Sequence, residues 1–217
     1  PIKSSAASDV YKRQLLVASL GMANPQITPL VPVLRSPWLS LHVSLIMVSY
    51  ALLGLLMLNG TAALALAAAA RAGTAERTSR TLARLRLFGR LLLYPAVFLL
   101  TSGIFTGAVW ANASWGRYWG WDPKEVWALI TLIVYALPLH EQSLARFRRP
   151  LFFHAYTLWA FAAVLMTYFG VNYLLGGMHS YGGGFRPGYA AATVFAAVTA
   201  FALLTVAALI RQRRTDT

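Results

Sequence analysis

The sequence contains no cysteine. Disulfides, thiolate metal sites and cysteine nucleophiles are therefore excluded within these 217 residues. Histidine is then the obvious strong ligand for a transition-metal ion, and it occurs only four times. The four candidate ligands are His42, His140, His154 and His179.

Acidic residues are also scarce, with 6 Asp and Glu against 19 Lys and Arg. Charged residues make up 12% of the chain, about half the share that is typical of soluble domains, while hydrophobic residues reach 58%. The formal net charge of +13 could suggest a nucleic-acid partner, but the basic residues lie between apolar runs. The composition predicts a protein surrounded by membrane lipid, with no nucleic-acid partner.

Five apolar stretches are long enough, at about 20 residues, to cross a hydrocarbon core as helices. They cover residues 38–58, 91–110, 125–139, 151–175 and 189–210. The third stretch is short, so we expect its helix to extend beyond both ends of the apolar core. The predicted fold is an all-α, polytopic transmembrane helix bundle of about five to six spans.

The N-terminal region divides into two parts. Pro1 to Gln14 is polar, does not begin with methionine and is interpreted as a non-informative or non-native segment, which leaves residues 15–217 as the expected transmembrane domain. Residues 15–34 are interrupted by one asparagine and three prolines, Asn24, Pro25, Pro29 and Pro32. These breaks predict the tail of a preceding helix that leads into an irregular outer segment.

Basic residues are distributed unevenly between the two sides of the predicted bundle. Twelve arginines lie on one side: Arg71, Arg77, Arg80, Arg84, Arg86, Arg90, Arg146, Arg148, Arg149, Arg211, Arg213 and Arg214. The opposite side carries four basic residues, Arg35, Arg117, Lys124 and Arg186. The arginine-rich side is therefore expected to be cytoplasmic. His42 and His179 then lie at the outer surface, and His140 lies toward the cytoplasmic one.

The densest chemical feature is the segment 110–127, which reads WANASWGRYWGWDPKEVW and contains five tryptophans. An aromatic belt at the headgroup level is one explanation. A belt requires neither glycine turns nor clustered charges, however, whereas a platform for a large flat apolar ligand uses aromatic faces, close backbone approach and a few cations. Asp122 and Pro123 predict a helix N-cap and first turn, with Glu125 near the helix start.

Two histidines bracket this segment on the outer side. A lone interfacial histidine is more often a structural hydrogen-bonding residue, but the pair His42 and His179 suits axial ligation of a haem iron. His179 lies in the glycine-rich stretch 175–184, where backbone could approach a flat ligand. His140 ends the third span. A favourable interaction of this histidine with the helix dipole explains its position there as well as a functional role does. His154 is interpreted as structural.

The sequence resembles the haem-handling membrane proteins with a tryptophan-rich "WWD" domain, and most closely the CcsA/ResC type of system II cytochrome c biogenesis. Residues 115–130, WGRYWGWDPKEVWALI, match that motif. Residues 34–42, LRSPWLSLH, and the segments 168–173, YFGVNY, and 178–182, MHSYG, agree in order. The matching pieces extend over about 30–184, and family members tend to carry more spans upstream. The resemblance implies the C-terminal part of a longer protein in the bacterial cytoplasmic membrane.

The resemblance also implies roles for individual residues. His42 and His179 would be the external axial ligands of haem b, and His140 an inner-leaflet ligand during haem passage. The external site would be lined by the aromatic loop, with Trp115, Arg117, Trp119, Trp121, Asp122, Lys124 and Trp127. A CcsB/ResB-like subunit and apocytochrome c are the implied partners in a holocytochrome c synthase complex, to which this chain supplies no evident catalytic acid, base or nucleophile.

Two rival functions remain open from the sequence. The chain could be a haem carrier that delivers haem to a chaperone without forming thioethers, although the DPKE continuation of the tryptophan motif belongs to the synthase type. It could also be an unrelated membrane permease, although the sequence lacks the repeats and broken helices often seen in transporters. A red protein with a bis-histidine absorption spectrum would favour haem handling.

The arginine asymmetry yields a topological prediction. A reporter fused after Arg214 is expected to be cytoplasmic, and a tag inserted near Ser180 is expected to react with an external probe. The opposite pattern of accessibility would overturn every site assignment above.

Overall fold

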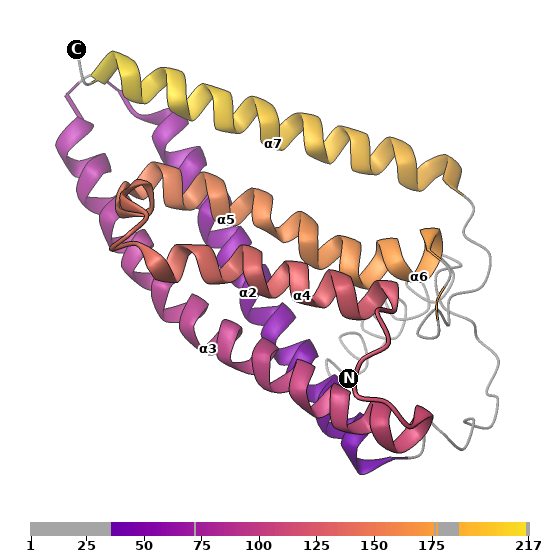
Figure 1. Cartoon of the computed structure of the whole chain (residues 1–217). Coiled ribbons are helices and arrows are strands. Elements are labelled where there is room, and N and C mark those ends of the chain that lie inside the picture. Colours follow the sequence, from indigo (N-terminus) through magenta and orange to yellow (C-terminus); the bar gives the residue numbers. More distant parts are fainter. Residues whose placement is uncertain (1–35, 72, 176, 178–186, 216–217) are drawn as a thin grey trace, which may run out of the picture. The chain divides into compact units, whose positions relative to one another are not determined.

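A computed structural model describes residues 36–71, 73–175, 177 and 187–215, all within one compact unit, Ser36–Thr217 (Figure 1). The segment 15–34 and His179 lie outside the described residues. The described part of the chain is all-helical, as predicted. Its main helices are α2 (Pro37–Ala69), α3 (Ala75–Trp115), α4 (Pro123–Ala136), α5 (Pro150–Leu165), α6 (Val171–Leu174) and α7 (Pro187–Thr215), joined in places by the short helices η2 (Leu137–His140), η3 (Ala145–Arg148) and η4 (Met166–Gly170).

Four helical segments are long and apolar enough to cross a membrane, so the chain is a multi-pass membrane protein. They are Pro37–Ala69, Ala75–Trp115, Pro150–Leu174 and Thr193–Gln212. The third predicted span corresponds to α4, whose 14 residues are fewer than a full crossing requires. As expected, its helical path extends beyond the apolar core, because it begins at Pro123 and continues through η2 to His140.

Helix α2 contacts α3, α5 and α7, and α4 contacts α3 and α5 (Figure 1). Glycines allow two of these contacts to be close. A Cβ at Gly60 of α2 would lie 2.8 Å from the carbonyl oxygen of His154 in α5, and a Cβ at Gly103 of α3 would lie 2.6 Å from Ile46 Cδ1. Small residues serve this purpose in membranes, where helices associate mainly through van der Waals packing and hydrogen bonds.

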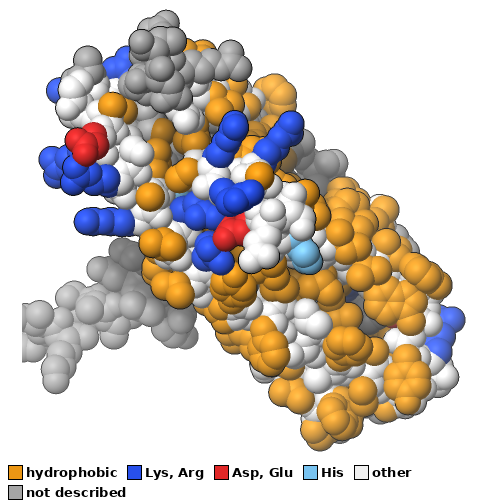
Figure 2. Space-filling model, turned by 60° about the vertical axis from the view of Figure 1, so that its left-hand side comes forward, with side chains coloured by type: hydrophobic (Ala, Val, Ile, Leu, Met, Phe, Trp, Pro, Cys, Tyr) orange, Lys and Arg blue, Asp and Glu red, His pale blue; other side chains and the backbone are white. Residues whose placement is uncertain are grey.

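Large apolar side chains are exposed along the spans. Leu91, Phe98 and Phe105 of α3 are 71%, 70% and 69% exposed, and Phe195 of α7 is 74% exposed. Hydrophobic side chains accordingly dominate much of the face drawn in Figure 2. In a bilayer these side chains face hydrocarbon instead of water, so the bundle does not require a large buried core.

The arginines of residues 77–90 lie on a different kind of element from the one predicted. The predicted spans 38–58 and 91–110 leave these arginines in the connection between them, but they lie on the first part of α3. At about 1.5 Å per residue, the 41 residues of α3 extend for about 60 Å, twice the thickness of a hydrocarbon core. Helix α3 therefore continues beyond the bilayer at its arginine-rich end. Most basic side chains in Figure 2 gather on one part of that face.

Gly60 provides a test of the α2–α5 contact. Gly60→Ala should lower the free energy of unfolding by about 1–3 kcal/mol, because the new methyl group meets the backbone of α5, which cannot move aside cheaply. Thermal unfolding in detergent measures the effect. Gly54→Ala is the control, since a Cβ there lies 3.8 Å from Phe161, an ordinary contact. Equal melting temperatures for the two variants would contradict the packing.

Candidate functional site

The tryptophan-rich loop begins where α3 ends. Gly116 adopts a left-handed conformation, with φ of 73°, and its N–H donates to the carbonyl of Asn112 at 2.8 Å. Trp121 also has a positive φ, 56°, which is rare for a bulky side chain. Both neighbours of Trp121 are fixed, because the N–H groups of Gly120 and Asp122 donate to Glu125 Oε2 at 2.8 and 3.2 Å. Glu125 thus holds this strained turn in place.

The predicted N-cap at Asp122 is confirmed. Asp122 Oδ2 accepts a hydrogen bond from the Lys124 N–H at 3.2 Å, while Glu125 reaches back to the Asp122 N–H, and together they form a capping box at the start of α4. Asp122 is 6% exposed, so its carboxylate lies inside the loop. Asp122, Pro123 and Glu125 therefore have a local structural role that is independent of any ligand.

The tryptophans form two edge-to-face pairs with different environments. Trp110 and Trp115 have ring centroids 4.8 Å apart at the end of α3, and Trp110 is only 2% exposed. Trp119 and Trp121 are 5.8 Å apart in the loop, and Trp121 is 72% exposed. Trp127 lies separately, in the second turn of α4. Trp121, with the half-buried Trp119 beside it, is the part of the motif that offers exposed aromatic surface to a flat ligand.

Two cationic side chains accompany the loop. Arg117 lies against Gly120, where a Cβ would be 2.9 Å from the guanidinium Nε, so a side chain at this position would displace the guanidinium. Lys124 Nζ donates to Asn172 Oδ1 at 2.9 Å. Burial lowers the pKa of the Lys124 ammonium, and the nearby Asp122 carboxylate opposes that shift. Both cations could neutralise a carboxylate on a bound ligand.

Asn172 was not singled out from the sequence as a site residue. Its Nδ2 donates to the carbonyl of Tyr168 at 2.7 Å, and its Oδ1 accepts a hydrogen bond from the Lys124 ammonium. Tyr168 lies in η4, a π-helical turn of the kind that is frequent at functional sites. The sequence signal for Asn172 was its position in the matching segment YFGVNY.

The chain that follows α6 approaches the loop at Gly177. A Cβ at Gly177 would lie 2.5 Å from Asp122 Oδ1 and 3.1 Å from Pro123 Cδ. The backbone therefore lies directly against the buried carboxylate, and a side chain would separate them. This contact brings the segment after α6 to the start of α4.

His42 lies in the second turn of α2, against the last third of α3. Its Nδ1 lies 2.7 Å from the carbonyl oxygen of Gly103, so Nδ1 carries the proton and Nε2 is the nitrogen with the lone pair. A Cβ at Gly107 would be 2.6 Å from Nδ1, so a glycine is required beside the imidazole. From Gly107 to Trp115 the helix rises by about 12 Å. His42 is thus near the aromatic loop along α3.

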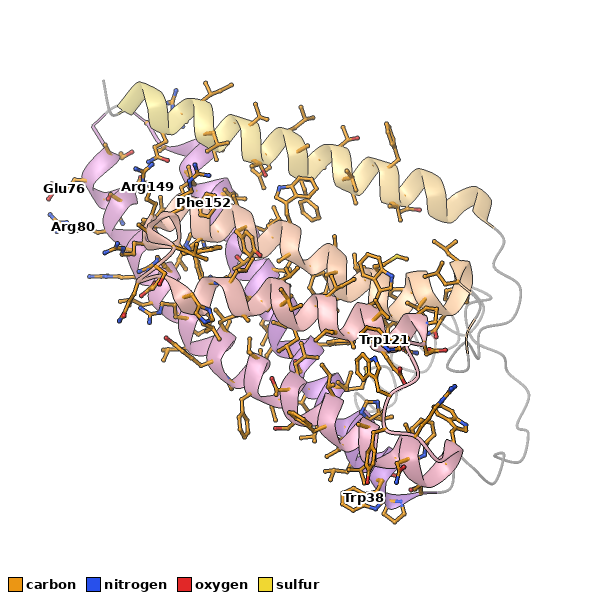
Figure 3. All side chains as sticks on the ribbon, viewed as in Figure 1. Trp38, Glu76, Arg80, Trp121, Arg149 and Phe152 are labelled. Atoms are coloured by element: carbon orange, nitrogen blue, oxygen red, sulfur yellow. The ribbon has the colours of Figure 1, made fainter. Side chains whose placement is uncertain are left out.

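His140 lies at the other end of α4 and η2. Helix rise over Pro123–His140 amounts to about 29 Å, so His140 is remote from the tryptophan loop. Its side chain is exposed, and Nδ1 lies 2.9 Å from the carbonyl oxygen of Ala136. The same argument as for His42 leaves Nε2 as the nitrogen with the lone pair. Figure 3 shows the wider separation, with Trp38 and Trp121 at one end of the bundle and Arg80 and Arg149 at the other.

His154 has the structural position expected of it. The residue is fully buried in α5, and Nε2 lies 3.2 Å from the carbonyl oxygen of Leu82 in α3. Among the described residues no cluster of three or more His, Cys, Asp or Glu could hold a bare metal ion.

These features define a multi-pass membrane protein with an aromatic loop and a half-buried histidine toward one end and an exposed histidine at the other. Residues 7–179 match the family model described as Cytochrome C assembly protein. That match covers most of the 217 residues, so the chain belongs to the cytochrome c assembly protein family.

Curated relatives carry names that agree with this family. The chain is 44% identical to Protein NrfI of Wolinella succinogenes over 170 residues, 78% of the chain and 19% of that protein. It is 38% identical to the cytochrome c biogenesis protein CcsA of Chlamydomonas reinhardtii, over 76% of the chain and 46% of that protein. For CcsA of Parasynechococcus marenigrum the identity is 37%, over 84% of the chain and 68% of that protein. The chain thus spans only part of the length of these relatives.

Proposed function

We propose that this chain holds haem b at the outer face of a bacterial cytoplasmic membrane and presents it for covalent attachment to apocytochrome c. Family membership supports a role in cytochrome c assembly, and the names of the relatives agree with it. The observation that carries the proposal is His42, whose Nδ1 donates to the carbonyl of Gly103, on the last part of α3, which leads into the tryptophan loop. A neutral imidazole oriented in this way is the usual haem ligand.

The residues around the loop fit the chemistry of haem. The macrocycle is flat and apolar, carries two propionate carboxylates and offers its iron to axial ligands. Trp119 and Trp121 offer aromatic surface, and Arg117 and Lys124 offer positive charge. Trp115 and Trp127 would complete the lining, and Asp122 would hold the loop in shape through the capping box. We assign these residues to the external site.

His179 is the proposed second axial ligand, and it lies outside the described residues. Two imidazoles would saturate the iron and shield it from oxygen until an apocytochrome arrives. Each thiol of the apocytochrome would then add its S–H across a haem vinyl group, so the C=C bond becomes a thioether. The chain's contribution to that step is orientation of the haem, which can lower a barrier by several kcal/mol without an acid or base from the protein.

His140 is the proposed ligand on the inner side, where haem would first be bound before it moves outward. Its Nε2 is oriented by the bond from Nδ1 to Ala136, in the same way as for His42. A CcsB/ResB-like membrane subunit would supply the second inner ligand, and the two subunits would form the synthase. The twelve arginines on the His140 side are the basis for assigning that side to the cytoplasm.

The tryptophan pair gives the first test. Replacing Trp119 and Trp121 by alanine should weaken haem binding by about tenfold, because about 1.4 kcal/mol of stacking is lost, while membrane insertion stays intact. Haem content per protein measures the effect. Trp159→Ala is the matched control, since this tryptophan lies in α5 and donates to Thr205 of α7. Equal haem content in the pair variant and the parent would leave only the aromatic-belt explanation.

The histidines give the second test. His42→Gly and His179→Gly should each abolish cytochrome c maturation and open a coordination position at the outer haem. Added imidazole should restore maturation, because it fits the cavity that the removed histidine side chain leaves. His140→Gly should instead reduce the haem that reaches the outer site without changing its absorption spectrum, because His140 is about 29 Å along the helices from the loop.

The measurement is maturation of a co-expressed cytochrome, with the CcsB/ResB-like subunit present, with and without imidazole, alongside absorption spectra. Normal maturation by both His42→Gly and His179→Gly without imidazole would refute the axial-ligand assignment. Haem bound with normal spectra, but transferred to a chaperone without thioether formation, would favour the carrier function.

A further inference from the structure

Glu141, the residue directly after His140, forms ion pairs with two arginines of α3. Arg90 Nη1 lies 2.7 Å from Glu141 Oε1, and Arg86 Nη2 donates to Glu141 Oε2. The side chains are only partly exposed, 14% for Arg86, 31% for Arg90 and 17% for Glu141. Each oxygen of this carboxylate therefore has its own guanidinium, in a site where solvent screening is weaker than at the surface.

The same two arginines are fixed by other contacts. Arg86 Nε donates to the carbonyl of Phe147 at 3.0 Å, and its guanidinium lies 5.9 Å from the centroid of the Phe153 ring. Arg90 Nη2 donates to the hydroxyl of Tyr94 at 2.7 Å. Arg86 thus joins both ends of the connection between α4 and α5, at Glu141 and at Phe147.

His140 depends on this connection for its position. It ends the four-residue 3₁₀ helix η2, a kind of turn whose internal hydrogen bonds have poor geometry and hold it weakly. Its own side-chain bond, to Ala136, lies within the same helical stretch and cannot fix that stretch relative to α3. Pro138 anchors η2 on its buried side. Glu141 supplies the bond to α3.

We propose that Glu141, held by Arg86 and Arg90, is a positioning residue for His140. It fixes the end of η2 against α3 and so determines where His140 Nε2 meets a ligand. This inference rests on the proposed function, in which His140 binds haem on the inner side. Glu141 does not touch the haem. It acts through His140, and its loss has no effect on binding once the imidazole of His140 is absent.

The chain contains a matched control for the ion pair. Glu76 and Arg80 form an i,i+4 pair in the first turns of α3, with side chains 80% and 69% exposed. Exposed pairs of this kind contribute little to stability. Glu76→Gln removes one negative charge from the same end of the bundle as Glu141→Gln, but it leaves the end of η2 untouched.

The experiment compares Glu141→Gln, Glu76→Gln, His140→Gly and the double variant Glu141→Gln/His140→Gly. Each is expressed as the full chain together with the CcsB/ResB-like subunit, with haem supplied, and the complex is purified in detergent. The readouts are haem per protein, the absorption spectrum of the bound haem, and the thermal unfolding midpoint. Arg90→Lys and Arg90→Gln extend the series, since lysine keeps a charge within reach of Glu141 and glutamine does not.

Glu141→Gln should lower haem content by about tenfold and leave the absorption spectrum unchanged. Loss of a residue that supports a metal ligand typically lowers metal affinity by about 10–100-fold, and we expect the low end of that range. Glu76→Gln and Arg90→Lys should retain the haem content of the parent, and Arg90→Gln should lose part of it. In the His140→Gly background Glu141→Gln should cause no further loss of haem, although its effect on the unfolding midpoint persists.

Two results would overturn the positioning role alone. One is a normal haem content in Glu141→Gln while His140→Gly is depleted. The other is an equal loss of haem on Glu141→Gln with and without His140, which would mean that the ion pair acts only on stability. Normal haem content in His140→Gly would instead overturn the inner-ligand assignment, and this inference with it. The outer-site tests on His42 are independent of all three results.

Discussion

The bundle depends on hydrogen bonds from side chains of α2 and α5 to backbone carbonyls of α3. Ser49 donates to Ala96, Asn59 to Leu85 and His42 to Gly103, all from α2, and His154 of α5 bonds to Leu82. Hydrocarbon offers no alternative partner to a polar side chain, so each of these donors needs a carbonyl, and a carbonyl in a helix has a second lone pair to accept it. Glycines allow the approach, as at Gly89, where a Cβ would be 3.0 Å from Asn59 Nδ2.

The proposed chemistry at the outer end uses the same interaction. The bond that packs His42 against α3 also selects its tautomer, so under the proposed function a structural contact prepares a haem ligand. The loop next to it is fixed differently, through the Glu125 carboxylate, which engages the backbone on both sides of Trp121 and keeps that ring exposed. A platform and a ligand that are both rigid before binding lose less entropy when haem arrives.

The end of the bundle that carries His140 is organised by charge. Few acidic residues face many arginines there, so only a few of the arginines can form ion pairs. Glu141 orders Arg86 and Arg90 between α3 and the α4–α5 connection, whereas the arginines of η3 remain exposed. Under the proposed function, haem would pass from a ligand positioned by ion pairs to one positioned by a backbone carbonyl, over a distance comparable to the thickness of the bilayer.

The sequence alone determined the features that depend on neighbours along the chain. Apolar run length predicted the spans, and Asp122 and Pro123 predicted the N-cap and first turn of α4, because a cap involves residues close together in the sequence. The family followed from the tryptophan motif. Only the tertiary structure revealed that residues 77–90 are helical, that His42 meets Gly103 across 61 positions, and that Glu141 meets Arg86 across 55. Local patterns do not encode the register between helices. Close packing at glycines sets that register, and the register in turn determines which group each histidine contacts.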